Sequence, residues 1–540
     1  MTLPPPAAQS SFALTDWVVL FGYFAVLAVT GVIFSRRKPA DTDDYFLGSR
    51  RMPAWAVAVS IVATSLSAVT FIGAPELAYA GNLTYLATNL GMVLAAVVIA
   101  VLFIPAFYRS GSASIYELLE TRFGVPARRA ASITFMIGRV LASGARIFAG
   151  AIPASIVLFG LERGTEPGSL ITAIGILTVV GIVYTLAGGI SSVIWSDVIQ
   201  FAILIGAAVC AIVLILGSIN APIGEVLAEL RHGGADGASK LTLLDTSWDL
   251  TASFSLPAAL IGFTLLGIGS YGTDQDLAQR MLTCRNARQG AWSVIGGILL
   301  GIPSVAVFLT VGLLLWIVFQ RPHLTNLPQV EQPGMTVTVF LHYILTQIPP
   351  GVRGLMMAGL FAAGLSSLNS AINSMSAAFI SDLYRPIMTN RVPIAKSERH
   401  YVVVGRCAVV GWGLILGLFA SLCIFWKRSN NDTLIDFALG VMAFAYAGLV
   451  GVFLTALLTK RGSSASVIAA LGVGFAWMLI TQPFLYNQIP VVHTPWLDDF
   501  YAIHYTWKLT IGVMLSFTTC VVGNRNQLST EVNRAAPDAA

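Results

Sequence analysis

The sequence predicts an all-α polytopic membrane protein, and three observations carry this prediction. Of the 540 residues, 56% are hydrophobic and only 11% are charged, whereas soluble domains carry about 25% charged residues. Apolar runs of about 20 residues or more, the length that crosses a bilayer as a helix, recur along the whole chain. The basic residues lie mainly in short loops between these runs, so the net charge of +5 does not indicate a nucleic-acid partner.

The apolar runs predict about 13 transmembrane helices in a single transporter-like domain over residues 1–540. No basic stretch precedes the first run, so we expect no cleavable signal peptide. Within the long loop 319–350, the segment TVTVFLHYILTQI predicts a short surface helix. The predicted spans are 14–34, 54–80, 84–108, 129–159, 169–187, 190–217, 251–282, 290–318, 351–385, 401–426, 433–458, 463–483 and 503–523.

The lysines and arginines concentrate in every second loop, which predicts how the chain is oriented. The loops after the first and third predicted spans are basic, whereas the loops after the second and fourth carry few basic residues. Basic loops stay in the cytoplasm. We therefore expect a multi-pass protein of the cell membrane, inner or plasma, with its N-terminus outside and its C-terminus cytoplasmic.

Two of the predicted spans carry signs of a break. The span 54–80 has polar residues near its middle, followed by Gly73 and Pro75, and the span 251–282 has several glycines ahead of Asp274. These spans lie five apart, so they would cross the bilayer in opposite directions. Broken helices at matching positions of two inverted halves are typical of a transporter's binding site. The halves would be the inverted repeats 54–217 and 251–458, with 14–34 and 463–523 as peripheral helices.

The stretch GLFAAGLSSLNSAINSMSAAFISD, residues 359–382, is long enough to span a membrane but unusually polar. Ser366, Ser370 and Ser374 are four residues apart and share one face of a helix. In lipid such a face needs a partner, either another helix, water or a ligand. Small polar residues also let helices pack closely, but the adjacent Ser366 and Ser367 and two asparagines favour a site for an alkali cation, which prefers oxygen ligands.

Four motifs together resemble the sodium:solute symporter family, which includes proline, sialic-acid and sodium/glucose cotransporters. They are DYFLGSRRMPAWAVAVSIVATSLSAVTFIG, YTLAGGISSVIWSDVIQ, YGTDQDLAQRML and AAGLSSLNSAINSMSAAFISDLY, and the resemblance covers roughly residues 44 to 460. The resemblance implies a LeuT-like fold with two inverted five-helix repeats plus peripheral helices. It also implies sodium as the coupling ion for a small organic solute.

The resemblance implies a main sodium site between the first broken helix and the serine-rich span. Its ligands would be the backbone carbonyls of Ala63, Leu66 and Ala363 and the hydroxyls of Ser366 and Ser367. A break frees carbonyls that helical bonds would otherwise occupy, and two hydroxyls complete a neutral oxygen cage. The alternative for Ala63 and Leu66 is ordinary helix packing.

Asp197 is the clearest acidic residue inside a predicted span, where a carboxylate is costly and indicates function. The alternative is a hydrogen-bond cap or an interfacial charge. The resemblance implies a second sodium site at Asp197, Asn369 and Ser370. Members with that site usually carry Ser or Thr at the position of Asn369, so this chain departs from the family pattern there.

Arg139 and Arg146 lie seven residues apart on the predicted span 129–159, with Arg146 the deeper. A guanidinium stays charged in a membrane and needs an anion or several carbonyls. Arg146 would receive a substrate carboxylate as a two-pronged pair; the alternative is a structural salt bridge or a side chain reaching the interface. Arg139 is expected to be structural.

The other predicted substrate-binding residues line the first break or face it. With Arg146 they resemble the pocket of the sialic-acid branch, whereas Val69 and Thr70 do not match the sugar branch. Asp274 and Gln275 belong to a family motif, and we expect them in an inner polar network. The substrate-binding prediction comprises Ser65, Ser67, Thr70, Tyr85, Asn89, Arg146 and Tyr271, with Tyr271 as part of a gate.

The sequence therefore predicts sodium-coupled secondary active import of a small organic solute by alternating access, carboxylate-bearing such as a sialic acid or other organic acid. The alternative is sodium/sugar symport. An integral-membrane enzyme is disfavoured because GxSxG, HExxH and Walker motifs are missing, and a transporter-fold sensor would carry soluble signalling domains. The five cysteines show no metal or redox spacing. Expected partners are the solute and the lipid bilayer, with no protein partner evident.

Overall fold

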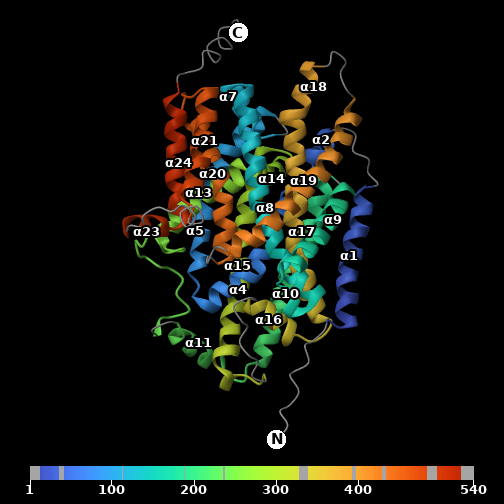
Figure 1. Cartoon of the computed structure of the whole chain (residues 1–540), viewed down its shortest axis with the longest axis vertical. Helices are drawn as coiled ribbons and strands as arrows, with labels where there is room; N and C mark the ends of the chain where they lie inside the picture. The colour runs from blue at the N-terminus through green and yellow to red at the C-terminus, as the bar shows by residue number, and fades with distance from the viewer. Residues whose placement is uncertain are drawn as a thin grey trace.

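The computed structural model describes residues 12–35, 42–111, 114–187, 189–234, 237–327, 338–391, 397–428, 433–482 and 495–523. These residues form an elongated bundle in which long helices run roughly parallel to the longest axis (Figure 1). The basic residues Arg36, Arg37, Lys38, Lys396, Arg525 and Arg534, which contribute to the charge pattern of the loops, lie outside the described residues.

The first half of the described chain supplies the broken helix α3–α4 and five further helices of membrane-spanning length. In chain order the helices are α1 (Leu14–Ser35), α2 (Thr42–Leu47), η1 (Gly48–Arg50), α3 (Ala54–Ser65), α4 (Ala68–Ala80), η2 (Thr84–Ala87), α5 (Thr88–Val98), η3 (Ile99–Phe103), α6 (Ile104–Ser110), α7 (Glu117–Phe123), α8 (Val125–Arg163), α9 (Pro167–Ala187), α10 (Ile190–Ser218) and α11 (Ile223–His232).

The second half begins with a helix interrupted by π-helical turns and then contributes the serine-rich helix α17. In chain order the helices are α12 (Leu256–Ala258), η5 (Ala259–Phe263), α13 (Thr264–Gly267), η6 (Ile268–Thr273), α14 (Gln275–Leu282), α15 (Ala287–Gln320), η7 (Pro322–Leu324), α16 (Val339–Thr346), α17 (Val352–Ala378), η8 (Phe379–Tyr384), α18 (Arg385–Arg391), α19 (Glu398–Arg428), α20 (Leu434–Leu458), α21 (Ser464–Ile480), α23 (Pro495–Ala502) and α24 (Tyr505–Val522).

The spans agree closely with the apolar runs of the sequence. Within the described residues, 11 helices are long and apolar enough to cross a membrane, and the bent pair α3–α4 makes up to 12. The remaining predicted span, 463–483, corresponds to the 17-residue apolar helix α21. The apolar runs therefore located every long helix because each run must be buried against other helices or lipid.

The first predicted break is present, with α3 and α4 meeting at an angle of 64°. Leu66 and Ser67 adopt extended backbone conformations between the two helices. The last carbonyls of α3 consequently have no following helical turn to bond with. The second predicted break falls at Asp274, which is extended between η6 and α14 and caps α14 through its side chain.

Close packing holds the broken helix against its neighbours. Both α3 and α4 pack along α15, while α10 packs along α17. Gly312 of α15 approaches the backbone of α4 so closely that a Cβ atom there would overlap the carbonyl oxygen of Pro75. The break is thus embedded in a dense core and not exposed at the surface.

The connecting segments separate into two sets at opposite ends of the bundle. The helices α2, α7 and α18 lie at one end in Figure 1, and α11 and α16 lie at the other. The first set belongs to the predicted inner loops and the second to the predicted outer loops. This separation is what alternate crossing of the bilayer requires, and which end faces the cytoplasm stays a prediction.

The short helix predicted in the loop 319–350 is present as α16, but the prediction that it lies on the surface is wrong. Phe340, Leu341 and Ile344 are each fully buried. Phe340 stacks on Phe71 of α4 with ring centroids 5.2 Å apart. The apolar side chains of this segment therefore cover α4, the second half of the broken helix.

Candidate ion and solute site

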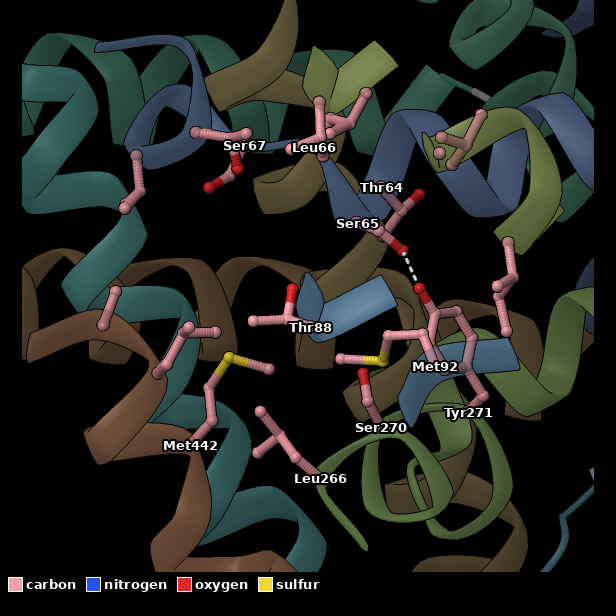
Figure 2. Close-up of a pocket in the computed structure, with 18 of the residues that line it drawn as sticks. Thr64, Ser65, Leu66, Ser67, Thr88, Met92, Leu266, Ser270, Tyr271 and Met442 are labelled. Atoms are coloured by element: carbon pink, nitrogen blue, oxygen red, sulfur yellow. Dashed lines mark hydrogen bonds between the residues drawn. The ribbon is translucent and has the colours of Figure 1, made fainter. Parts of the chain in front are cut away.

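A cavity of about 130 Å³ lies beside the break between α3 and α4. Its walls come from α3, α4, η2, α5, α8, α13, η6, α14, α15 and α20, and Figure 2 shows side chains from several of these elements converging on it. All of the predicted substrate-binding residues line this one cavity, namely Ser65, Ser67, Thr70, Tyr85, Asn89, Arg146 and Tyr271.

A hydrogen bond crosses the cavity between its two broken helices. The hydroxyls of Ser65 and Tyr271 lie 3.0 Å apart (Figure 2). The Ser65 hydroxyl donates its proton to the carbonyl of Ile61 at 2.8 Å, so Tyr271 is the donor to Ser65. Tyr271 therefore spans the cavity, which is the placement its predicted gating role requires.

Arg146 reaches the cavity from α8 and meets only weak acceptors there. One guanidinium nitrogen donates to the carbonyl of Thr64 at 3.3 Å, and the other approaches the sulfur of Met442 at 3.4 Å. No ion pair joins Arg146 to a carboxylate in the described part of the chain. A charged group with such poor partners in a membrane can still accept an anion.

Arg139, two turns away on α8, has a different environment. Its guanidinium lies 3.3 Å from the carboxylate of Asp274 and also pairs with Asp276. Arg139 is nearly fully buried within these pairs. These contacts agree with the structural role predicted for Arg139 and distinguish it from Arg146.

The serine pair of α17 faces the break. Ser367 donates to the carbonyl of Thr64 at 3.3 Å, and Ser366 donates to the carboxylate of Asp197 at 2.6 Å. Ala63, Leu66 and Ala363 are buried. Hydroxyls and unpaired helix-end carbonyls are the neutral oxygens that suit an alkali cation, so the residues here fit a sodium ion.

The family model of the sodium:solute symporter family matches residues 45–474. The chain belongs to this family. Membership of this family shows that the chain carries out sodium-coupled solute symport. It also confirms the prediction that the chain is not an enzyme. The predicted family resemblance is thus confirmed.

Individual members of the family resemble this symporter over most of its length. The sodium/sialic acid symporter SiaT of Proteus mirabilis is 31% identical over 481 residues, which are 87% of this chain and 90% of the relative. The human sodium-coupled monocarboxylate transporter 1 is 25% identical over 570 residues, which are 97% of this chain and 88% of the relative.

A solved structure of a Na⁺-coupled sialic acid symporter, described as substrate-bound and outward-open, has a similar fold. It aligns with a TM-score of 0.76 at 26% identity, covering 95% of this symporter and 98% of that chain. The prediction of an all-α membrane protein with a LeuT-like fold is confirmed.

The three residues predicted for a second sodium ion have different immediate partners in this symporter. Asp197 accepts from Ser366 and Ser60 and lies 3.1 Å from Arg280. The amide oxygen of Asn369 accepts from Thr185 at 3.2 Å, and Ser370 donates to Asp276. The grouping of Asp197, Asn369 and Ser370 around one ion stays a prediction.

A buried charge network connects the serine-rich helix to the second break, and the sequence reasoning identified only part of it. Arg280, near the end of the predicted span 251–282, is 1% exposed. It pairs with Asp276 at 2.7 Å and with Asp197 at 3.1 Å, and its Nε donates to Ser60. The motif YGTDQDLAQRML carried a signal for this network, because it places two aspartates and an arginine beside a long apolar run.

The polar network expected around Asp274 and Gln275 is present, and its place on the inner side stays a prediction. Tyr446 donates to Asp274 at 2.8 Å, and the side-chain oxygen of Gln275 accepts the backbone N–H of Ile115 at 3.0 Å. Residues that the sequence reasoning missed in the cavity are mainly apolar or weakly polar, and a lone sequence gives no signal for them. They include Thr88, Met92, Leu266, Ser270 and Met442.

Proposed function

We propose that this symporter imports a small carboxylate-bearing solute, such as a sialic acid or another organic acid, together with sodium. The observation that carries the proposal is the guanidinium of Arg146, which borders the cavity and pairs with no carboxylate in the described residues. A carboxylate would give Arg146 two parallel charge-assisted hydrogen bonds in place of its long contacts to Thr64 and Met442.

The remainder of the cavity suits a solute with hydroxyl groups. Ser65, Ser67 and Thr70 offer hydroxyls from the broken helix, and Asn89 offers an amide from α5. The names of two relatives point to acidic solutes, sialic acid and monocarboxylates. Sodium/sugar symport is the alternative, but it leaves the charge of Arg146 without a function.

One residue links solute and ion. The carbonyl of Thr64 accepts hydrogen bonds from both Arg146 and Ser367. A sodium ion bound by Ala63, Leu66, Ala363, Ser366 and Ser367 would draw Ser367 away from Thr64, and a solute carboxylate would draw Arg146 away. Each event changes the same end of α3, so the two sites are coupled through the break.

Alternating access follows from the same element. The repeats 54–217 and 251–458 would rock against each other around the two breaks, with the N-terminus outside and the C-terminus in the cytoplasm. Import of a singly charged anion with one sodium ion would be electroneutral, and a second ion at Asp197, Asn369 and Ser370 would make it electrogenic. Reversal-potential measurements in proteoliposomes distinguish the two stoichiometries.

A solute screen with and without sodium tests the proposal. Purified protein is heated with sialic acids, short monocarboxylates, sugars or amino acids, and we expect sodium-dependent stabilisation by a carboxylate. Arg146→Gln should abolish that stabilisation, whereas Arg163→Gln, at the exposed end of the same helix, should keep it. Stabilisation by a neutral sugar, or unchanged carboxylate binding in Arg146→Gln, would contradict the proposal.

A further inference from the structure

A second cavity, of about 620 Å³, lies on the opposite side of α17 from the charge network and has an apolar lining. Its walls come from α1, α8, α9 and α17. No charged side chain lines it in the described part of the chain. A cavity of this kind does not retain ordered water, because water needs two to four polar partners.

The cavity opens toward the surroundings of the bundle and ends on a buried floor. At its edge, Phe21 is 61% exposed and Val183 is 63% exposed. On its floor, Phe361 and Leu365 of α17 are buried. Because all four bounding helices are membrane spans, the exposed edge is continuous with the face that meets the hydrocarbon of the bilayer.

The outer wall of the cavity is fixed in place by polar contacts. Asp16 of α1 pairs with Arg353 of α17 at 2.7 Å and accepts the backbone N–H groups of Gly351 and Gly354. These bonds anchor the start of α1 to the start of α17. The cavity farther along α1 therefore cannot close simply by moving α1 inward without breaking a buried ion pair.

We propose that this cavity binds an acyl chain of a membrane lipid. An empty apolar space loses the dispersion contacts of its lining, and water does not replace them. A helix from a second copy of the chain is about 10 Å wide and would have to displace the anchored α1. A single hydrocarbon chain needs no hydrogen-bond partner and enters directly from the surrounding bilayer.

The bound chain would contact the back of the transport machinery. A narrower cavity continues from the same floor, sharing Leu177, Phe361 and Leu365 and including Gly150 and Gly364. Cβ atoms at these glycines would lie 3.5 Å and 4.0 Å from the side chain of Ala68, the first residue of α4. The acyl site therefore abuts the helix that carries the serine pair and approaches the break from behind.

Photo-crosslinking in liposomes tests the proposal directly. The full-length protein is reconstituted with a phospholipid that carries a diazirine in its acyl chain, irradiated, and digested for peptide mapping. We expect adducts on the α17 segment containing Phe361 and Leu365, which bulk lipid cannot reach. Adducts confined to exposed residues such as Phe21 would overturn the proposal, and so would a crosslinked dimer joined through α1, because a second copy would then occupy the cavity.

A matched pair of variants makes the test specific. Ala28→Phe fills the cavity from α1 and should remove the α17 adducts. Ala25→Phe adds the same group to an exposed position of α1 outside the lining and should leave them unchanged. If Ala28→Phe fails to fold, the smaller Ala28→Leu should give a partial loss, and undiminished adducts in the folded variant would contradict the assignment.

Discussion

Replacing Ser367 with alanine tests the sodium site with little disturbance of its surroundings. The Ser367 hydroxyl makes a long hydrogen bond of 3.3 Å to the carbonyl of Thr64. A sodium ion at the break would exchange this bond for an ion–oxygen contact. Contacts between a charged group and a hydroxyl contribute about 1.5–3 kcal/mol. Losing one should raise the half-saturating sodium concentration about 10- to 150-fold.

The assay is solute uptake into proteoliposomes as a function of external sodium at fixed solute concentration. Ser374→Ala provides the matched control, because Ser374 is buried on the same helix and donates to the carbonyl of Ala371 in its own helix at 3.1 Å. We expect the control to retain the sodium dependence of the natural protein. An unchanged sodium dependence in Ser367→Ala would refute the assignment of this hydroxyl to the ion.

Ser366→Ala should behave differently in a second measurement. Ser366 donates to the carboxylate of Asp197 at 2.6 Å, so its loss leaves a buried acceptor short of a donor. Such a loss costs about 1–3 kcal/mol of folding free energy. We expect Ser366→Ala to raise the sodium requirement and also to lower the melting temperature, while Ser367→Ala affects mainly the sodium requirement. Equal melting temperatures would argue against the Ser366–Asp197 bond.

The remaining predictions concern stability. Arg280→Met leaves Asp197 with hydroxyl donors alone and Asp276 with Arg139 as its remaining ion pair, and it should destabilise the protein by about 3–5 kcal/mol; an unchanged melting temperature would exclude the pairs. Gly312→Ala should lower the free energy of unfolding by about 1–3 kcal/mol, because the new Cβ would overlap α4. Gly296→Ala should not lower it, because its new Cβ would lie at an ordinary van der Waals distance from its neighbour. Burial lowers the pKa of Lys240, in the loop before α12, from 10.5 to about 8. Between these two values the unfolded chain binds more protons, so stability should rise from pH 8 to pH 10, and Lys240→Met should lose this rise in thermal melts.

The sequence predicted the features that depend on local chemistry. Apolar runs located the spans because every span must bury or solvate its surface in lipid. The polar residues from Thr64 to Ser67 predicted a break, and the structure has extended backbone at Leu66 and Ser67. The depth of Arg146 in an apolar run predicted a cavity-lining residue, and the structure places it there. A charged guanidinium inside a membrane is costly and is usually found where it serves a function.

The features that the sequence did not predict depend on contacts between distant segments. The burial of α16 requires the aromatic surface of α4, including Phe71, which nothing in the loop sequence specifies. The burial of Arg280 depends on its partners Asp197 and Ser60, which lie on α10 and α3 and are distant from it in the sequence. The fold determines which residues pair when they are far apart in the sequence. A buried charge in an apolar run therefore indicates that a partner is needed, but it does not identify the partner.

The charge network also has a consequence for how the chain enters the membrane during synthesis. An unpaired arginine or aspartate at the centre of an inserting helix costs about 2.5–3.5 kcal/mol. Arg139 and Asp197 emerge from the ribosome before Arg280 and the aspartates of 274–276 are translated. Helices α8 and α10 therefore insert with these charges unpaired until the second half of the chain supplies the opposite charges.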